Sequence, residues 1–250
     1  MRRVLLSVLC GGLLLVVSSS TAFATATLEL VSGGDTLYVT DTGSILCTGG
    51  TCASFTASGD NNPLPGVVSI SAGSFNGWNI SLSSGSSNSP NCNGGSGVGC
   101  INNTNINAHT SGAGTLSIYF ADTNFATEQG FVVGLSSTLQ TGKSVTQNAY
   151  AFTGVLPLGS GVTSPVVTGL IGSPLTILSG VGGNLSTGGL GLSGPFDLLL
   201  YTTFVTDAGG GGFVVGGNIA AVPEPAALLL LGTVLTVCSS LLRKRYPARS

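Results

Sequence analysis

Charged side chains are scarce in this sequence, and positive charge is nearly absent from its middle. Only 6% of the 250 residues are Asp, Glu, Lys or Arg. Between residues 27 and 221, Lys143 is the one basic residue beside eight acidic residues, so this stretch has a net charge of −7. Binding to a phosphate backbone depends on clustered Lys and Arg side chains. The composition therefore excludes nucleic acid as a partner.

Catalytic side chains are also few. The only histidine, His109, lies in a polar stretch over residues 102–111, which predicts a surface loop. A single histidine rules out paired-histidine metal motifs, and the G-x-S-x-G motif of serine hydrolases does not occur. The sequence thus predicts a protein that is not an enzyme and that has no cofactor.

One catalytic alternative stays open at Asp41. The segment Asp41-Thr42-Gly43 follows an apolar run and resembles the active-site loop of aspartic proteases. That chemistry needs two carboxylates that share a proton, but neither Asp122 nor Asp207 is followed by Thr-Gly or Ser-Gly. The same residues also suit an ordinary turn between two strands. We expect the turn, and a secreted aspartyl-type hydrolase is the alternative.

Cysteines are few and lie close together in the chain. Four occur between residues 27 and 221: Cys47, Cys52, Cys92 and Cys100. Their spacing is a poor match to zinc sites, whereas cysteines outside the cytoplasm oxidise. Two local disulfides that close Gly-rich loops are the simplest of three possible pairings. No metal site is predicted, and a weaker alternative is calcium bound by three aspartates: Asp35, Asp41 and Asp60.

The remaining chain alternates between apolar, β-branched runs and clusters of Gly, Asn, Pro and Ser. Nine such runs are expected to be strands: residues 28–31, 36–40, 67–71, 78–82, 115–121, 131–139, 144–152, 196–206 and 213–219. No run before residue 222 keeps a helical period. The pattern predicts a mainly β protein, with a single β-sandwich-like or jelly-roll-like domain over residues 27–221.

Three details of this domain follow from local residue types. Residues 207–212 predict a hairpin turn that joins the last two strands. Residues 154–194 are rich in Gly, Pro and Leu at irregular spacing, so loops, short strands and a solenoid-like edge all stay open. Four aromatic residues are candidates for stacking on sugars, although the first is more often a core residue in such a segment: Trp78, Tyr38, Tyr119 and Tyr150.

The N-terminus has the pattern of a secretory signal peptide over residues 1–26. A cationic start precedes an apolar stretch over residues 4–17. Two A-x-A cleavage patterns end at Ala24 and at Ala26, so the mature chain is expected to begin directly after one of them. We therefore expect export by the general secretion machinery, with an uncleaved signal anchor as the alternative.

Residues 222–250 combine three features in a fixed order. The triplet Pro223, Glu224 and Pro225 is followed by an uncharged apolar run over residues 226–242 and then by a basic cluster: Arg243, Lys244 and Arg245. At about 1.5 Å per residue, a helix over the run spans roughly 25 Å, which suffices for a bilayer core. The basic cluster favours the cytoplasmic side. We predict a transmembrane helix with a basic cytoplasmic tail over residues 243–250.

This order resembles the PEP-CTERM sorting signal of Gram-negative bacteria that make exopolysaccharide. The resemblance is confined to residues 222–245. It implies that an exosortase, a membrane-embedded processing enzyme, recognises the Pro-Glu-Pro triplet and that the chain is processed nearby. It also implies a precursor anchored in the inner membrane that later reaches the cell surface or the extracellular matrix. An ordinary C-terminal anchor is the alternative.

These features together predict an exported surface or matrix protein whose β-domain has a non-enzymatic, structural or adhesive role. The partners that the resemblance implies are the exosortase and the membrane, which the C-terminal helix enters. Exopolysaccharide is a further expected partner, and a carbohydrate-binding module is one alternative for the β-domain. The other alternative is the aspartyl-type hydrolase that uses Asp41.

Overall fold

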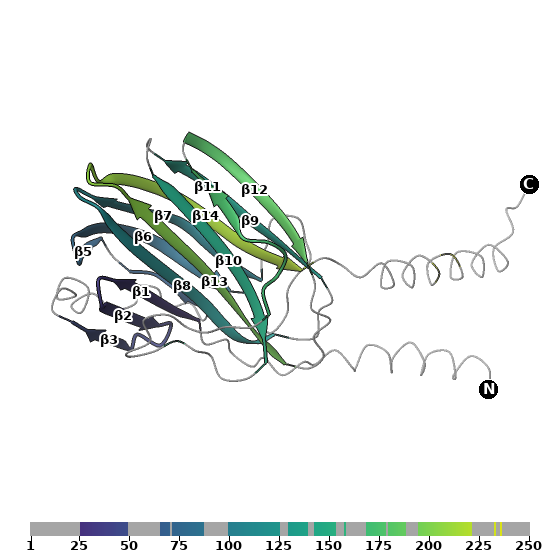
Figure 1. Cartoon of the computed structure of the whole chain (residues 1–250). Coiled ribbons are helices and arrows are strands. Elements are labelled where there is room, and N and C mark those ends of the chain that lie inside the picture. Colours follow the sequence, from purple (N-terminus) through teal and green to yellow (C-terminus); the bar gives the residue numbers. More distant parts are fainter. Residues whose placement is uncertain are drawn as a thin grey trace, which may run out of the picture.

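The computed structural model describes residues 26–49, 66–70, 72–87, 100–125, 130–139, 143–153, 158, 169–178, 180–188, 195–221, 233 and 236. These residues form two seven-stranded sheets. The paired strands of both sheets run antiparallel. Figure 1 shows the two sheets as layers of one sandwich. The expectation of a mainly β, sandwich-like fold is confirmed.

The first sheet, sheet A, has the strand order β11-β10-β13-β8-β1-β2-β3. In chain order its strands are β1 (Thr27–Ser32), β2 (Asp35–Thr40), β3 (Ile45–Thr48), β8 (Gly114–Phe125), β10 (Ser144–Phe152), β11 (Leu175–Ile177) and β13 (Phe196–Thr206).

The second sheet, sheet B, has the order β12-β9-β14-β7-β6-β4, and β5 also pairs with β6. Its strands are β4 (Val67–Val68), β5 (Gly73–Phe75), β6 (Trp78–Ser87), β7 (Ile101–Thr110), β9 (Phe131–Leu139), β12 (Gly180–Gly188) and β14 (Gly211–Ala221).

The strands β7 to β14 follow the order of a jelly roll. Sheet A contains β8-β13-β10-β11 and sheet B contains β7-β14-β9-β12, so four pairs of consecutive strands are each divided between the two sheets. Such a double sheet buries one face of each layer against the other. The jelly-roll order therefore gives each sheet one inner face and one outer face.

Aromatic side chains fill the space between the two sheets. Phe213 of β14 lies 6.0 Å from Trp78 and 4.9 Å from Phe204, measured between ring centroids. A second group joins Phe125, Phe131 and Phe196 at 5.8 Å centroid distances. All six rings are at most 1% exposed. Burial of this apolar surface is the main force that holds the layers together.

Two expectations about local structure are wrong. Residues 207–212 do not form a hairpin turn, because β13 pairs with β8 and β10 in sheet A whereas β14 pairs with β7 and β9 in sheet B. The connection instead crosses between the layers. The stretch over residues 102–111 is not a loop, because residues 101–110 form the central strand β7. Because Asn and Thr occupy most of its positions, the alternation of apolar and polar residues that marks a strand is not visible in the sequence.

The two ends of the chain lie mostly outside the described residues. Ala26, one of the two predicted cleavage residues, is fully buried in the core, and its carbonyl oxygen accepts a hydrogen bond from the Asp41 N–H at 3.0 Å. Ala24, the Pro-Glu-Pro triplet and the basic cluster are not among the described residues. Of the predicted transmembrane helix, Thr233 and Thr236 are described, and both are helical. Within the described part of the chain, no helix is long and apolar enough to cross a membrane.

Candidate functional site

The outer face of sheet B has a row of small side chains that crosses β14, β9 and β12. Successive residues of a strand point to opposite faces, so alternate residues of each strand share this face. Outer-face residues that lie opposite one another in the three strand pairs form rows that cross the sheet. Each row therefore brings together residues that are far apart in the sequence.

Two rows carry the larger side chains. In order from β7 to β12, they are Asn102, Asn218, Gly134 and Leu185 in one row, and Asn107, Val214, Thr138 and Val181 in the other. On β14, β9 and β12, the row between them contains small residues: Gly216, Ser136 and Gly183. We call the depression along this middle row the trough.

The trough is a hollow of substantial size. A cavity of about 620 Å³ is lined by residues of β7, β9, β12 and β14, including Asn102 and Asn218. A second hollow of about 220 Å³ shares Ser136 and Gly216 with the first. Because these residues belong to the middle row, the two hollows adjoin along it. Volumes of this order accommodate a small organic ligand or a short stretch of polymer.

Glycine at position 134 shapes one wall of the trough. A Cβ atom on Gly134 would lie 2.3 Å from Oδ1 of Asn218, which is far too close. The absence of a side chain therefore allows the Asn218 amide to lie across the neighbouring strand. Leu185, on the far side of Gly134, is 77% exposed. The Asn218 amide and the Leu185 side chain thus lie on either side of Gly134.

The chemistry of the trough is neutral and suited to hydroxyl groups. Its lining contains no Asp, Glu, Lys or Arg. A side-chain amide such as that of Asn102 or Asn218 both donates and accepts hydrogen bonds, as a sugar hydroxyl also does. Exposed Val181 and Leu185 offer apolar contact beside these amides. Sequence reasoning missed this site, and the only signal for it was the alternation of Val and Leu with Gly in residues 180–188 and 213–219.

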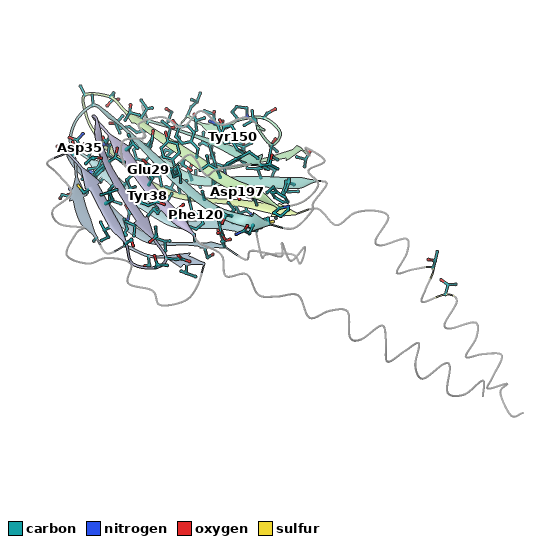
Figure 2. All side chains as sticks on the ribbon, turned by 90° about the horizontal axis from the view of Figure 1, so that it is seen from below. Glu29, Asp35, Tyr38, Phe120, Tyr150 and Asp197 are labelled. Atoms are coloured by element: carbon teal, nitrogen blue, oxygen red, sulfur yellow. The ribbon has the colours of Figure 1, made fainter. Side chains whose placement is uncertain are left out.

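The aromatic residues expected to stack on sugars lie elsewhere. Trp78 is 1% exposed and packs in the core, which confirms the core position favoured for it and removes it as a residue that could stack on a sugar. Tyr38, Tyr119 and Tyr150 share the outer face of sheet A, and Figure 2 shows Tyr38 beside Glu29 with Tyr150 farther along the sheet. The structure thus brings three of the four aromatic candidates to one face, on the side opposite the trough.

Tyr119 is not available as a stacking platform. Its ring is 1% exposed and stacks on Tyr201 at a centroid distance of 4.4 Å and an interplanar angle of 3°. Burial, followed by the hydrogen bond to Tyr201, raises the pKa of the Tyr119 hydroxyl. Together with Val31, Phe152 and Leu199, Tyr119 belongs to a small second core on this face. Around Tyr119, the outer face of sheet A therefore serves packing.

Asp41 has a structural role in the turn that its residues predict. The N–H of Gly43 donates to the carbonyl oxygen of Thr40 at 2.9 Å, and Gly43 has a φ of 81° that favours glycine. One carboxylate oxygen of Asp41 accepts a hydrogen bond from the N–H of Gly66 at 3.1 Å. This contact fixes the chain after β2 to the segment before β4.

A fully buried carboxyl, Asp122, lies near the end of β8. Burial, and to a lesser extent the charges of Asp41 and Asp197, raises its pKa to about 7. Its Oδ1 accepts from the Thr123 N–H at 2.7 Å, whereas its Oδ2 has no hydrogen-bond partner. The described residues include no group of three side chains that could hold a metal ion. Asp60 lies outside the described residues, so calcium binding by Asp35, Asp41 and Asp60 stays an alternative.

The other predicted residues are placed as follows. Cys47 in β3 and Cys100 next to β7 are disulfide-bonded, but Cys52 and Cys92 lie outside the described residues, so the pairing stays a prediction. His109 is exposed on β7, where it lies opposite Asn79 and lines a separate hollow of about 380 Å³. None of these residues lines the trough.

Comparisons with known proteins give weak likenesses. No protein-family model matches the chain, and no curated protein matches it. A carbohydrate-binding module, TmCBM61 in complex with β-1,4-galactotriose, is 12% identical with a TM-score of 0.33 over 61% of this chain and 92% of its own. The adhesin domain of Epf from Streptococcus pyogenes is 11% identical with a TM-score of 0.37 over 80% of this chain and 60% of its own.

A promiscuous carbohydrate-binding module of the β-sandwich superfamily is likewise 11% identical, with a TM-score of 0.31 over 80% of this chain and 86% of its own. Likenesses this weak assign no ligand to the chain.

Proposed function

We propose that the β-domain is a non-enzymatic, adhesive module that binds an uncharged polysaccharide in the trough of sheet B. The observation that carries this proposal is the lining of the trough: amides of Asn102 and Asn218 flank a floor of small residues, with exposed Leu185 beside them. Amides match hydroxyl groups, and apolar side chains match the C–H faces of sugar rings.

Electrostatics favours a neutral polymer over an acidic one. The only cation between residues 27 and 221, Lys143, is 5% exposed and forms an ion pair with Asp207. No basic side chain of this stretch is therefore left to attract uronate or sulfate groups. With a net charge of −7, the domain instead repels an acidic polymer over the distance of the Debye length, about 8 Å in physiological salt.

The domain acts outside the cytoplasm in this proposal. The signal pattern over residues 1–26 and the tail over residues 222–250 support delivery by the general secretion machinery, followed by processing by an exosortase. A polysaccharide-binding domain fits such a destination, because the polymer is made and retained at the cell surface. Neither end of the chain adds a catalytic group.

The test is to fill the trough. Ser136, exposed at the centre of the middle row, is changed to Tyr in the full chain. We expect binding of neutral exopolysaccharide, measured by calorimetry, to weaken at least tenfold because the ring occupies the floor. Asn218→Ala is expected to weaken binding roughly three- to tenfold through the loss of one hydrogen bond.

The matched control is Thr115→Tyr, which adds the same ring at an exposed position of β8 in sheet A and should bind as the unchanged chain does. Unchanged affinity in Ser136→Tyr would overturn the proposal.

A further inference from the structure

Strand β12 forms an open edge of sheet B. Its nine residues pair along their whole length with β9, and no described strand pairs with the other side (Figure 1). The backbone N–H and C=O groups on that side point away from the sheet. An edge of this kind is a template for pairing with another strand.

Residues 180–188 lack the features that usually prevent such pairing. They contain no charged residue and no proline, and the strand continues regularly against β9 without a shift in register. Val181 is 82% exposed and Leu185 is 77% exposed. Natural edge strands commonly carry Lys, Pro or a bulge for protection. Here the edge is both exposed and apolar.

The inner face of the sheet holds this edge in place. Asn184 donates from Nδ2 to the carbonyl oxygen of Thr176 at 2.8 Å, and Oγ of Ser186 accepts from the N–H of Ser173 at 2.9 Å. Both contacts tie β12 to residues in and next to β11, at the edge of sheet A. An edge that is already ordered loses less conformational entropy when it pairs.

The lengths of the edges identify the partner. The other described strands at the edges of the two sheets have three residues in β11, four in β3, two in β4 and three in β5. Of these described edge strands, β12 alone is long enough to support an extended ladder, and a second copy of the chain offers the same strand. Antiparallel pairing about a two-fold axis is self-complementary. The occupant that fits β12 is therefore β12 of another copy.

We propose that two copies of this chain associate through antiparallel β12 strands centred on Gly183. In this register, Val181 lies opposite Leu185 of the second copy, and Leu185 lies opposite Val181 of the second copy. Directly opposed apolar pairs stabilise antiparallel strands. In this register, outer-face residues of one copy lie opposite outer-face residues of the other. The outer faces of the two copies of sheet B therefore lie on the same side. The pairing thus joins the two copies of sheet B into one continuous sheet.

The same register aligns the two troughs end to end. Gly183, the last residue of the middle row, lies opposite Gly183 of the second copy. Because strands are about 4.8 Å apart, the row of small residues over three strands in each copy extends to roughly 29 Å across the pair. A long polysaccharide then contacts both copies and binds with higher avidity. This second part, unlike the pairing itself, rests on the proposed function.

Cross-linking tests the pairing directly, in the full chain and without polysaccharide. In Gly183→Cys the two introduced thiols lie opposite each other, and the added Cβ makes only an ordinary 3.5 Å contact with the carbonyl oxygen of Leu135. We expect a disulfide-linked dimer on non-reducing gels, with the linked peptide identified by mass spectrometry. Thr187→Cys, on the same strand, is the register control, because its two copies lie roughly 27 Å apart.

A charge on the edge provides the second test. Val181→Lys in the Gly183→Cys background should lower the yield of linked dimer at least tenfold, because two lysines then flank the ladder. The matched control is Val205→Lys, which adds the same charge at an exposed valine of β13 in sheet A. Equal linking in Gly183→Cys and Thr187→Cys, or no effect of Val181→Lys, would overturn the pairing.

A separate measurement of polysaccharide affinity tests the joined trough. At concentrations where the unchanged chain is dimeric, it should bind a long neutral exopolysaccharide at least tenfold more tightly than at concentrations where it is monomeric, whereas a short oligosaccharide should bind equally well at both. Equal affinity for the long polymer would overturn the joined trough and leave the pairing intact. Failure of both forms to bind any glycan would overturn the proposed function, and the cross-linking result would stand.

Discussion

Single residues define the candidate site through the side-chain atoms that they lack. Gly134 allows the Asn218 amide to lie across β9, because a Cβ there would overlap the amide oxygen. Gly216, Ser136 and Gly183 keep the middle row low, whereas the neighbouring rows carry Val, Leu, Thr and Asn. The same small residues would weaken an isolated strand, since glycine has a low preference for strands. Their position on the outer face of sheet B agrees with the proposed binding surface, because glycine in a strand allows close approach of a ligand.

Asp122 gives the fold a stability that depends on pH. Its folded pKa of about 7 lies above its ordinary value of 3.8, so the folded chain binds a proton more tightly than the unfolded chain does. This contribution is fully present below pH 4 and is lost as the pH rises through 7. The unchanged chain should therefore lose roughly 2–4 kcal/mol of unfolding free energy between pH 4 and pH 8. Asp197, whose pKa burial also raises, adds in the same direction.

Asp122→Asn should remove most of this dependence. We expect the variant to equal the unchanged chain at pH 4 and to exceed it at pH 8, in denaturant titrations with the disulfides intact. Asp207→Asn is a control of opposite sign, because the hydrogen bond from Lys143 lowers the pKa of Asp207. That variant should lose stability above pH 4. A parallel pH profile for Asp122→Asn and the unchanged chain would contradict the assignment.

Among the elements, the sequence predicted the strands that have regular alternation and missed those that lack it. Eight of the nine expected runs lie within strands, because β-branched and apolar residues mark them, whereas of the run 67–71 only Val67 and Val68 form a strand. Strand β7 was expected to be a loop, because Asn and Thr occupy most of its positions and conceal the buried Ile106 and Ala108. Strand β12 was left among several alternatives, because Gly occupies four of its nine residues.

The candidate site could not be predicted for the same reason. The trough forms only when β7, β14, β9 and β12 lie side by side, and their order depends on connections that cross between the sheets. The sequence indicated a hairpin at residues 207–212, because Gly and Asp suit a tight turn equally well in either arrangement. Aromatic residues were the visible signal for sugar binding, but Trp78 and Tyr119 are needed for packing.

The connection between β13 and β14 depends on Lys143. Its ammonium group pairs with Asp207, and a Cβ on Gly211 would lie 2.4 Å from its Cε, so the aliphatic stem packs against this crossing. Because Asp207 is exposed, removing the charge leaves no buried, unpaired group. Lys143→Met should therefore keep the melting temperature within about 2 °C, whereas Lys143→Ala, which also removes the stem, should lower it by roughly 3–6 °C.

Differential scanning calorimetry at low and high salt checks this prediction. The small loss in Lys143→Met should disappear in 1 M salt, because salt screens the ion pair. The loss in Lys143→Ala should persist, because packing does not depend on ionic strength. Equal losses in both variants would show that the charge, and not the stem, supports the crossing.

At the scale of the whole molecule, the basic residues are concentrated at the two ends of the chain. Six of the seven basic residues lie at the two ends, in the stretches expected to direct export and membrane sorting. The domain between them is left acidic, with its one cation paired to Asp207. A neutral trough on an acidic domain is suited to an uncharged polymer at the cell surface. In the proposed function, the two ends direct the domain to the cell surface, and sheet B binds the polymer there.

The sorting proposal predicts that a single change in the tail alters the location of the whole chain. Glu224 is the only charge between two prolines, and an exosortase is proposed to recognise it there. Glu224→Ala in the native host should leave the chain at full tail length in the membrane fraction, as mass spectrometry and fractionation would show. Glu128→Ala, a glutamate outside the tail, is the control and should be processed normally. Normal processing of Glu224→Ala would show that the apolar run is an ordinary anchor, while polysaccharide binding by the trough would be unaffected.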